Sequence, residues 1–253
     1  MGSEVCRSVA GADGLTLVGG VDPHHAGGGL AELTRAMVAP DGLTTIGADP
    51  GDLLAVKPDV AIDFTVHGAA MQNLRWCAAN GVHAVVGTTG FSDADLAELR
   101  AAFTTSNCLI AANFAIGAVL MMRFAELAAP FFETAEVIEY HHDGKVDSPS
   151  GTAIATVNRM AAAKSNWAPD PTQKEVIPGA RGGRGAADIR VHAVRMRGVV
   201  ANQEVILGTT GQTLLIRHDT TDRTSFMPGV VLAAQRIGAH PGLTIGLDSF
   251  LGL

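Results

Sequence analysis

The sequence predicts an α/β protein with a doubly wound, Rossmann-like dinucleotide-binding domain followed by an α+β domain. Up to about residue 115, short apolar runs alternate with segments of helical periodicity, which is typical of a parallel sheet covered on both faces. From residue 116 onward, two helices and several alternating strands indicate a mixed, largely antiparallel sheet. A final helix and strand follow, so we expect the end of the chain to return to the first domain.

The composition excludes several functional classes. With 253 residues, 47% of them hydrophobic and 17% charged, the chain can bury an ample core. Its formal net charge of −7 argues against general binding to nucleic acids or anionic membranes. The three cysteines have no metal-like spacing, and no signal peptide or long apolar span is present. We therefore expect a cytoplasmic protein with no resident metal, no nucleic-acid partner and no membrane partner.

The first domain is expected to contain short elements separated by glycines and capping residues. Val5 and Val9 are spaced as on one face of a short helix that ends near Gly11. Further helical segments are predicted at 30–38, 52–56, 68–80 and from 92 onward. Strands are predicted at 15–21, 43–46, 60–64, 82–86 and 109–112.

The second part contains longer elements. Helices are predicted from about 116 to 130 and from 151 to 163, and residues 165–188 look irregular. Strands are predicted at 135–140, and at 189–194, 199–207 and 213–218, of which the last three alternate like antiparallel strands. The segment 208–211 has the composition of a hairpin turn. A last helix at 228–237 and a last strand at 243–247 complete the chain.

The beginning of the chain departs from the usual dinucleotide-binding pattern. That pattern opens with a strand, a glycine-rich turn and a helix that binds the pyrophosphate, and an acid closes the second strand. Asp22 fits the acid, but only Met1 and Gly2 precede the first helix. We therefore expect an N-terminally truncated domain that lacks the first strand and most of the turn. Without that turn, Asp22 could equally be a polar residue that merely closes a strand.

Three protonatable side chains lie close together in one predicted loop, namely His141, His142 and Lys145. Side chains that are adjacent on extended backbone point to opposite sides, so the two histidines are expected to have different roles. Such a cationic loop suits an anionic substrate that must gain a proton. For an isolated histidine pair, a solvated polar loop is the alternative. A metal site is less favoured because no further ligand stands at a suitable spacing.

A helix is predicted to start directly after this loop, at Ser150-Gly151-Thr152-Ala153. The backbone N–H groups of a helix start can bind a carboxylate, and a glycine lets a ligand approach closely. An ordinary serine cap is the alternative. Because the histidines and Lys145 stand next to it, a carboxylate site is the better interpretation.

Residues that follow two predicted strands form a second candidate site. Gly87, Thr88 and Thr89 end a buried strand and precede a helix, where open parallel sheets bind ligands. Residues 111–114 follow the next strand along the chain, although they could also be plain core.

Residues 139–153, EYHHDGKVDSPSGTA, resemble the signature of the dihydrodipicolinate reductase (4-hydroxy-tetrahydrodipicolinate reductase) family of lysine biosynthesis. Residues 87–91, 111–117 and 219–229 also resemble family segments and occur in the family order. The resemblance extends over the whole chain. It departs from the family at Ala112, where a proline is usual.

This resemblance implies NAD(P)H-dependent reduction of 4-hydroxy-tetrahydrodipicolinate to tetrahydrodipicolinate in lysine and diaminopimelate biosynthesis. Residues 1–115 and 225–253 would bind the cofactor. Residues 116–224 would bind the cyclic dicarboxylate substrate and build a homotetramer. Family members use either NADH or NADPH, and an acid at Asp22 favours NADH. Two alternatives stay open: another two-domain NAD(P)-dependent dehydrogenase of amino-acid metabolism, or an inactive or poorly folding remnant.

The resemblance also implies roles for single residues. The candidate proton donors are His141 and Lys145, and the substrate-binding residues are His142, Gly151 and Thr152. The cofactor-binding residues are Asp22, Gly87, Thr88, Thr89, Ala111, Ala112, Asn113 and Phe114.

Overall fold

A computed structural model describes all residues from 1 to 253, and the chain divides into two compact units. Unit 1 comprises Met1–Ala115 and Phe226–Leu253, and unit 2 comprises Ile116–Ser225. No helix in either unit is both long enough and apolar enough to cross a membrane.

Unit 1 is built on a four-stranded parallel sheet with the strand order β1-β2-β3-β9. These strands are β1 (Val60–Asp63), β2 (His83–Val86), β3 (Cys108–Ile110) and β9 (Leu243–Ile245). Because β9 pairs with β3, the end of the chain returns to the first unit. The predicted parallel sheet of a doubly wound domain is therefore confirmed.

Local capping signals set several helix ends of unit 1. Helix α3 ends at Gly81, which adopts a left-handed φ of 68° as expected of a glycine C-cap. Helix α4 starts with a capping box between Ser92 and Asp95. The helices of this unit are α1 (Gly2–Ala10), α2 (Leu30–Thr34), η1 (Pro50–Ala55), α3 (His67–Asn80), α4 (Asp93–Ala102), α7 (Met227–Arg236), η5 (Ile237–Ala239) and α8 (Asp248–Leu251).

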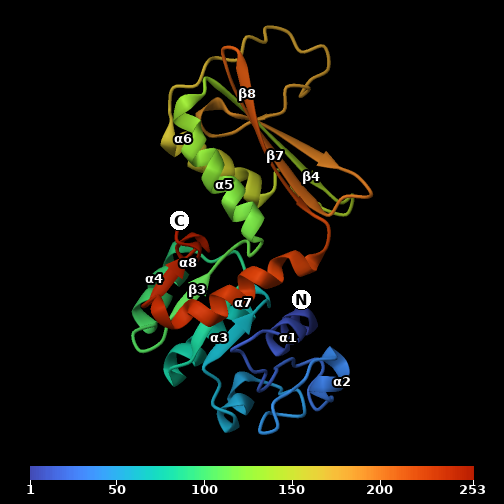
Figure 1. Cartoon of the computed structure of the whole chain (residues 1–253), viewed down its shortest axis with the longest axis vertical. Helices are drawn as coiled ribbons and strands as arrows, with labels where there is room; N and C mark the ends of the chain where they lie inside the picture. Colours follow the sequence, from blue (N-terminus) through green and yellow to red (C-terminus); the bar gives the residue numbers. More distant parts are fainter. The chain divides into compact units, whose positions relative to one another are not determined.

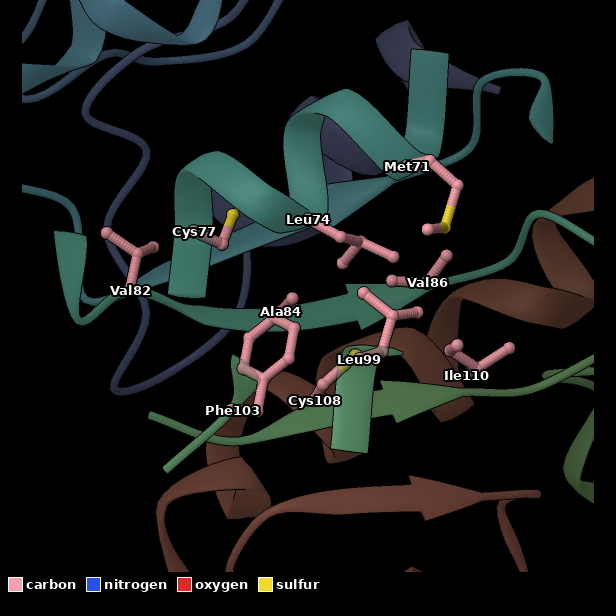
Figure 2. Close-up of a cluster of buried hydrophobic side chains, with 10 residues drawn as sticks. All are labelled: Met71, Leu74, Cys77, Val82, Ala84, Val86, Leu99, Phe103, Cys108 and Ile110. Carbon is pink, nitrogen blue, oxygen red and sulfur yellow. The ribbon is translucent and has the colours of Figure 1, made fainter. Parts of the chain in front are cut away.

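The core beside this sheet is formed by side chains from α3, α4, β2 and β3, as Figure 2 shows. Leu74 of α3 and Leu99 of α4 are almost completely buried there. Burial raises the pKa of the Cys77 thiol to about 12 and raises that of the Cys108 thiol as well. Both thiols therefore stay protonated and behave as small apolar side chains.

Two strands predicted in unit 1 do not form. Residues 15–21 and 43–46 make only isolated bridges, Val21 with Gly47 and Gly29 with Thr45. Backbone carbonyls of the first segment accept hydrogen bonds from the N–H groups of residues 39, 43 and 47. Because these donors are unevenly spaced, no continuous ladder forms. The predicted helix 30–38 is also too long. It ends at Thr34 because Arg35 adopts the left-handed conformation.

Unit 2 contains a five-stranded mixed sheet with the order β5-β6-β4-β7-β8. Its strands are β4 (Thr134–His141), β5 (Gly183–Arg184), β6 (Arg190–Arg195), β7 (Ala201–Thr209) and β8 (Gln212–Thr220). Helices α5 (Ile116–Ala128) and α6 (Gly151–Ala163) pack side by side along one face of this sheet (Figure 1). Single turns lie at η2 (Ala129–Phe131), η3 (Ala186–Asp188) and η4 (Arg223–Phe226).

The direction of β6 corrects the sequence-based expectation of an antiparallel strand. It runs parallel to β4, because α6 and a long irregular segment carry the chain back before β6 begins. The predicted hairpin is confirmed, since β7 and β8 pair antiparallel across a turn at Thr210 and Gly211. The mixed, largely antiparallel character of the sheet is therefore also confirmed.

The packing of α7 provides a test of this fold. A Cβ atom at Gly229 would lie only 2.1 Å from the carbonyl oxygen of Phe114, whereas one at Gly68 in α3 would have nothing within 4 Å. We predict that Gly229→Ala lowers the free energy of unfolding by about 1–3 kcal/mol through overpacking. Gly68→Ala is the matched control and should be neutral or slightly stabilising. Urea unfolding measures both, and equal effects of the two substitutions would contradict the packing described.

Candidate active site

The candidate active site of unit 2 is organised around Glu139, whose side chain is fully buried. Its Oε2 contacts Nδ1 of His141 at 2.5 Å and Nη1 of Arg195 at 2.8 Å. Its Oε1 accepts hydrogen bonds from Nη2 of Arg195 at 2.9 Å and from the Ser150 backbone N–H at 3.1 Å. We call these four residues the Glu139 cluster. The sequence-based prediction did not include Glu139 or Arg195.

Strand register explains why these side chains meet. Side chains two residues apart on a strand share a face, so Glu139 and His141 of β4 point to the same side. In the parallel pairing of β4 with β6, His141 lies opposite Arg195. Arg195 also donates from Nη2 to the carbonyl oxygen of Asp147 at 2.7 Å. The cluster therefore joins β4, β6, the loop and the start of α6.

Charge stabilises the buried carboxylate. Burial raises the pKa of Glu139, but the hydrogen bonds and charges of Arg195 and His141 outweigh burial and hold that pKa below its usual value. Glu139 is therefore an anion at neutral pH, and its charge is compensated by Arg195.

The two histidines have different environments. His141 is mostly buried, with 16% of its side chain exposed, and its Nδ1 faces Glu139. Because a carboxylate only accepts hydrogen bonds, Nδ1 carries a hydrogen, and Nε2 is the nitrogen left for a ligand. His142 follows the end of β4 and is exposed. Its ring lies beside Gly144, where an added Cβ would be 3.3 Å from Nδ1.

Lys145 is held by an acid that the sequence-based prediction missed. Its Nζ contacts both carboxylate oxygens of Asp147, at 2.7 and 2.8 Å. The hydrogen bond from Lys145 lowers the pKa of Asp147. The Lys145 backbone N–H also donates to the carbonyl oxygen of His142 at 3.1 Å, which closes the loop on itself.

Helix α6 starts as predicted. The Ser150 hydroxyl caps it by accepting from the Ala153 N–H at 3.2 Å, and the first turn contains no acidic residue. Nothing lies within 4 Å of where a Cβ at Gly151 would stand, so a ligand can approach this backbone closely. The partial positive charge of the helix start favours an anion there.

In unit 1, the parallel strands bring the predicted cofactor residues to one edge of the sheet. Gly87, Thr88 and Thr89 follow β2, and residues 111–114 follow β3, its neighbour. Ligands of open parallel sheets bind at this carboxyl edge, so the position fits a dinucleotide.

The side chain of Thr88 is engaged inside the protein. Its hydroxyl donates to Thr65 O at 3.0 Å and lies 3.2 Å from Oδ1 of buried Asp63. Asp63, at the end of β1, also accepts from the Thr65 N–H and from Nδ2 of Asn73. A Cβ at Gly87 would come within 2.1 Å of the Phe64 ring. The contacts of Thr88 and Gly87 therefore fix the shape of the loop after β2. Within residues 87–89, Thr89 is the exposed residue.

Residues 111–114 divide between core and surface. Ala111 and Phe114 are buried, and the Phe114 ring packs 5.6 Å from that of Phe64. Ala112 is exposed, and Asn113 is partly exposed and accepts from the Ala115 N–H at 2.8 Å. Only Ala112 and Asn113 therefore offer side-chain surface to a ligand.

Asp22 is partly exposed and does not close a regular strand. Its Oδ1 accepts from the His24 N–H at 2.9 Å, and its Oδ2 contacts Nδ1 of His25 at 2.8 Å. The hydrogen bond with His25 lowers the pKa of Asp22. Its backbone N–H donates to Gly47 O, and Gly47 lines a cavity of about 380 Å³. A partly exposed, ionised carboxylate fits the ribose hydroxyls of a dinucleotide.

Two further observations concern ligands. A cavity of about 660 Å³ in unit 2 lies between α6, β6 and residues 179–186, and none of the predicted site residues lines it. No group of three or more histidine, cysteine, aspartate or glutamate side chains is arranged to hold a metal ion.

Comparison with known proteins follows the same division into two parts. The family described as dihydrodipicolinate reductase, N-terminus, matches residues 1–114, and the family described as dihydrodipicolinate reductase, C-terminus, matches residues 117–251. The 4-hydroxy-tetrahydrodipicolinate reductase of Mycobacterium sp. (strain KMS) is 49% identical over 233 residues, which cover 88% of this chain and 94% of the relative. The enzyme of the same name from Nocardia farcinica is 46% identical and covers 100% of this chain and 95% of the relative.

A solved structure agrees with these matches. The dipicolinate-bound dihydrodipicolinate reductase from Paenisporosarcina sp. TG-14 is 36% identical, with a TM-score of 0.85, and the match covers 98% of this chain and 94% of that chain. The fold and the matches define a nicotinamide-dependent oxidoreductase. The chain belongs to the dihydrodipicolinate reductase family.

The Glu139 cluster should make stability depend on pH. The folded pKa of Glu139 is below its unfolded value, so its contribution is present above the unfolded pKa and is lost as pH falls toward the folded pKa. We predict that Glu139→Gln costs about 3–5 kcal/mol of unfolding free energy at pH 7, because Arg195 loses its partner. Below about pH 4 the difference from wild type should shrink. Urea unfolding between pH 7 and pH 3 measures this, and a difference that does not change with pH would contradict it.

Proposed function

We propose that this chain catalyses the NAD(P)H-dependent reduction of 4-hydroxy-tetrahydrodipicolinate to tetrahydrodipicolinate in lysine and diaminopimelate biosynthesis. The observation that carries this proposal is the Glu139 cluster, which ties a histidine of the signature to the start of α6. Relatives of that name, alike over most of both chains, support the same activity.

The substrate is a ring with two carboxylates, and unit 2 offers cationic and amide groups for both. We assign one carboxylate to the start of α6, at Gly151 and Thr152. The other would lie against the loop that carries His142 and Lys145. The bound dipicolinate of the solved relative is a ring of the same dicarboxylate class, which supports this assignment.

The reaction needs a hydride and a proton. A bound NADH or NADPH would supply the hydride, and the substrate hydroxyl would leave as water. The chain must provide the proton, and His141 and Lys145 are the candidate donors. His141 can present Nε2 because Glu139 holds Nδ1, whereas Lys145 already contacts Asp147. General acid catalysis of this kind contributes about 10²–10⁴-fold to rate.

Unit 1 would hold the cofactor. We assign the ribose hydroxyls to Asp22, and the nicotinamide half to Gly87, Thr88 and Thr89 together with residues 111–114. Because Thr88, Ala111 and Phe114 are buried, they would act through their backbone or by shaping the loop. An acid at Asp22 favours the unphosphorylated ribose of NADH over the 2′-phosphate of NADPH.

Assembly and location stay predictions. The resemblance implies a homotetramer that forms through the sheet of unit 2. Half-buried Ile138 and Ile206, together with exposed Leu215, lie on the face opposite α5 and α6 and would suit such contacts. The free cysteines Cys77 and Cys108 accord with the cytoplasmic location expected from the sequence.

The alternative of an inactive or poorly folding remnant is not favoured. Each unit has a continuous sheet and a buried core, and the Glu139 cluster is complete. Another two-domain dehydrogenase is not favoured either. Both family matches, and a relative that matches the whole chain, bear the name of the same enzyme.

Substitutions should separate chemistry from cofactor binding. His141→Ala and Lys145→Ala are both predicted to lower kcat and to leave the Kd of NADH nearly unchanged. The variant that removes the actual proton donor should lose about 10²–10⁴-fold in kcat. Asp22→Ala should weaken NADH binding and largely preserve kcat at saturation. Steady-state kinetics with 4-hydroxy-tetrahydrodipicolinate and calorimetry with NADH measure these effects. Exposed Lys174→Ala is the matched control. Full turnover in both His141→Ala and Lys145→Ala would refute the proposed donors.

The oligomer is tested separately. We predict a homotetramer in analytical ultracentrifugation, and Leu215→Glu should convert it to smaller species by placing a charge in an apolar contact. Val176→Glu, at an exposed position of the irregular segment, is the control and should leave the assembly intact. A wild-type monomer would refute the assembly without affecting the proposed reaction.

A further inference from the structure

Glu139 holds two halves of the candidate active site with its two oxygens. Oε2 contacts the His141 imidazole, and Oε1 contacts the Ser150 N–H, one residue before the first turn of α6. Arg195 bonds to both oxygens and keeps the carboxylate plane fixed between them. One carboxylate therefore sets where the imidazole stands relative to the helix start.

We propose that Glu139 is a positioning residue for the reduction, acting through His141 and through the start of α6. It fixes the imidazole so that Nδ1–H points inward and Nε2 faces the substrate. At the same time it holds the amide groups that would bind the substrate carboxylate at a constant distance from Nε2. This inference rests on the proposed function and adds a residue that touches neither substrate nor cofactor.

The proton step can be written with Glu139 unchanged throughout. The imidazolium of His141 gives its Nε2 proton to the substrate, and the neutral ring keeps its Nδ1 hydrogen on Oε2 of Glu139. A bound NADH or NADPH would supply the two electrons with the hydride, the substrate hydroxyl would leave as water, and solvent would return the proton to Nε2. Glu139 stays ionised because Arg195 neutralises it, so it orients the ring and stabilises the imidazolium, as an aspartate does in a serine-protease triad.

A second group of the same composition on the same strand allows a matched control. Glu136 of β4 contacts Nε2 of His192 at 2.6 Å and Nη2 of Arg181 at 2.7 Å. It lies three residues before Glu139 and therefore on the other face of the strand. It is more exposed than Glu139, and none of its hydrogen bonds reaches α6 or the loop. Removing its charge disturbs a glutamate–histidine–arginine group without touching the proposed site.

The experiment compares Glu139→Gln, Glu139→Asp and Glu136→Gln in the full chain. We expect Glu139→Gln to lower kcat by about 10²-fold or more and to weaken binding of the probe dipicolinate, with the Kd of NADH nearly unchanged. Because the imidazole no longer faces a carboxylate, the pH dependence of kcat should differ from that of wild type. Glu136→Gln should keep kcat, the pH profile and dipicolinate binding near wild type.

Glu139→Asp keeps the inference testable if Glu139→Gln fails to fold. The aspartate retains the charge that Arg195 needs, but its shorter side chain cannot reach both His141 and the Ser150 N–H. We expect at least a tenfold loss of kcat and a smaller loss of thermal stability than in Glu139→Gln, because Arg195 keeps a charged partner. A folded Glu139 variant with wild-type kcat and pH profile would overturn the inference, and so would an equal loss in Glu136→Gln. If wild type itself does not turn over 4-hydroxy-tetrahydrodipicolinate, the proposed function fails instead.

Discussion

A carboxylate without access to water lies at the centre of unit 2, and four N–H groups from three parts of the chain converge on it. Such a charge is tolerated only when it is paired and fully hydrogen-bonded. In the parallel pairing of β6 with β4, Arg195 lies opposite His141 and donates to this carboxylate. The same requirement holds the start of α6 against the strand. The hydrogen bonds of Glu139 thus tie β4 to β6 and to the start of α6 on either side of the signature loop.

Unit 1 uses a comparable device at the carboxyl edge of its sheet. Asp63 ends β1 and accepts hydrogen bonds from Thr65, Asn73 and Thr88, which ties the loop after β1 to the loop after β2. The neighbouring Gly87 has no side chain because the Phe64 ring fills that space. In both candidate sites a buried acid thus fixes the neighbouring loops by hydrogen bonds and supports the residues that would contact a ligand.

Much of the fold could be predicted because its signals are local. The glycine at 81 ends α3, the Ser92 capping box starts α4, and Ser150 starts α6, as their sequence neighbours indicate. The candidate proton donors and the helix start were also recognisable, since they lie within about a dozen consecutive residues. The prediction of strands at 15–21 and 43–46 was wrong. A segment with β-propensity forms a strand only when a neighbouring segment continues the hydrogen-bond ladder.

The sequence by itself determined the α/β class, the order of most elements and the candidate proton donors. Only the tertiary structure decided which acidic side chains contact these candidate donors. Arg195 stands 56 residues from Glu139, and Thr88 stands 25 residues from Asp63. No periodicity or motif relates residues so far apart. Their contacts depend on strand register and on the cost of burying a charge, and both arise only when distant segments pack together.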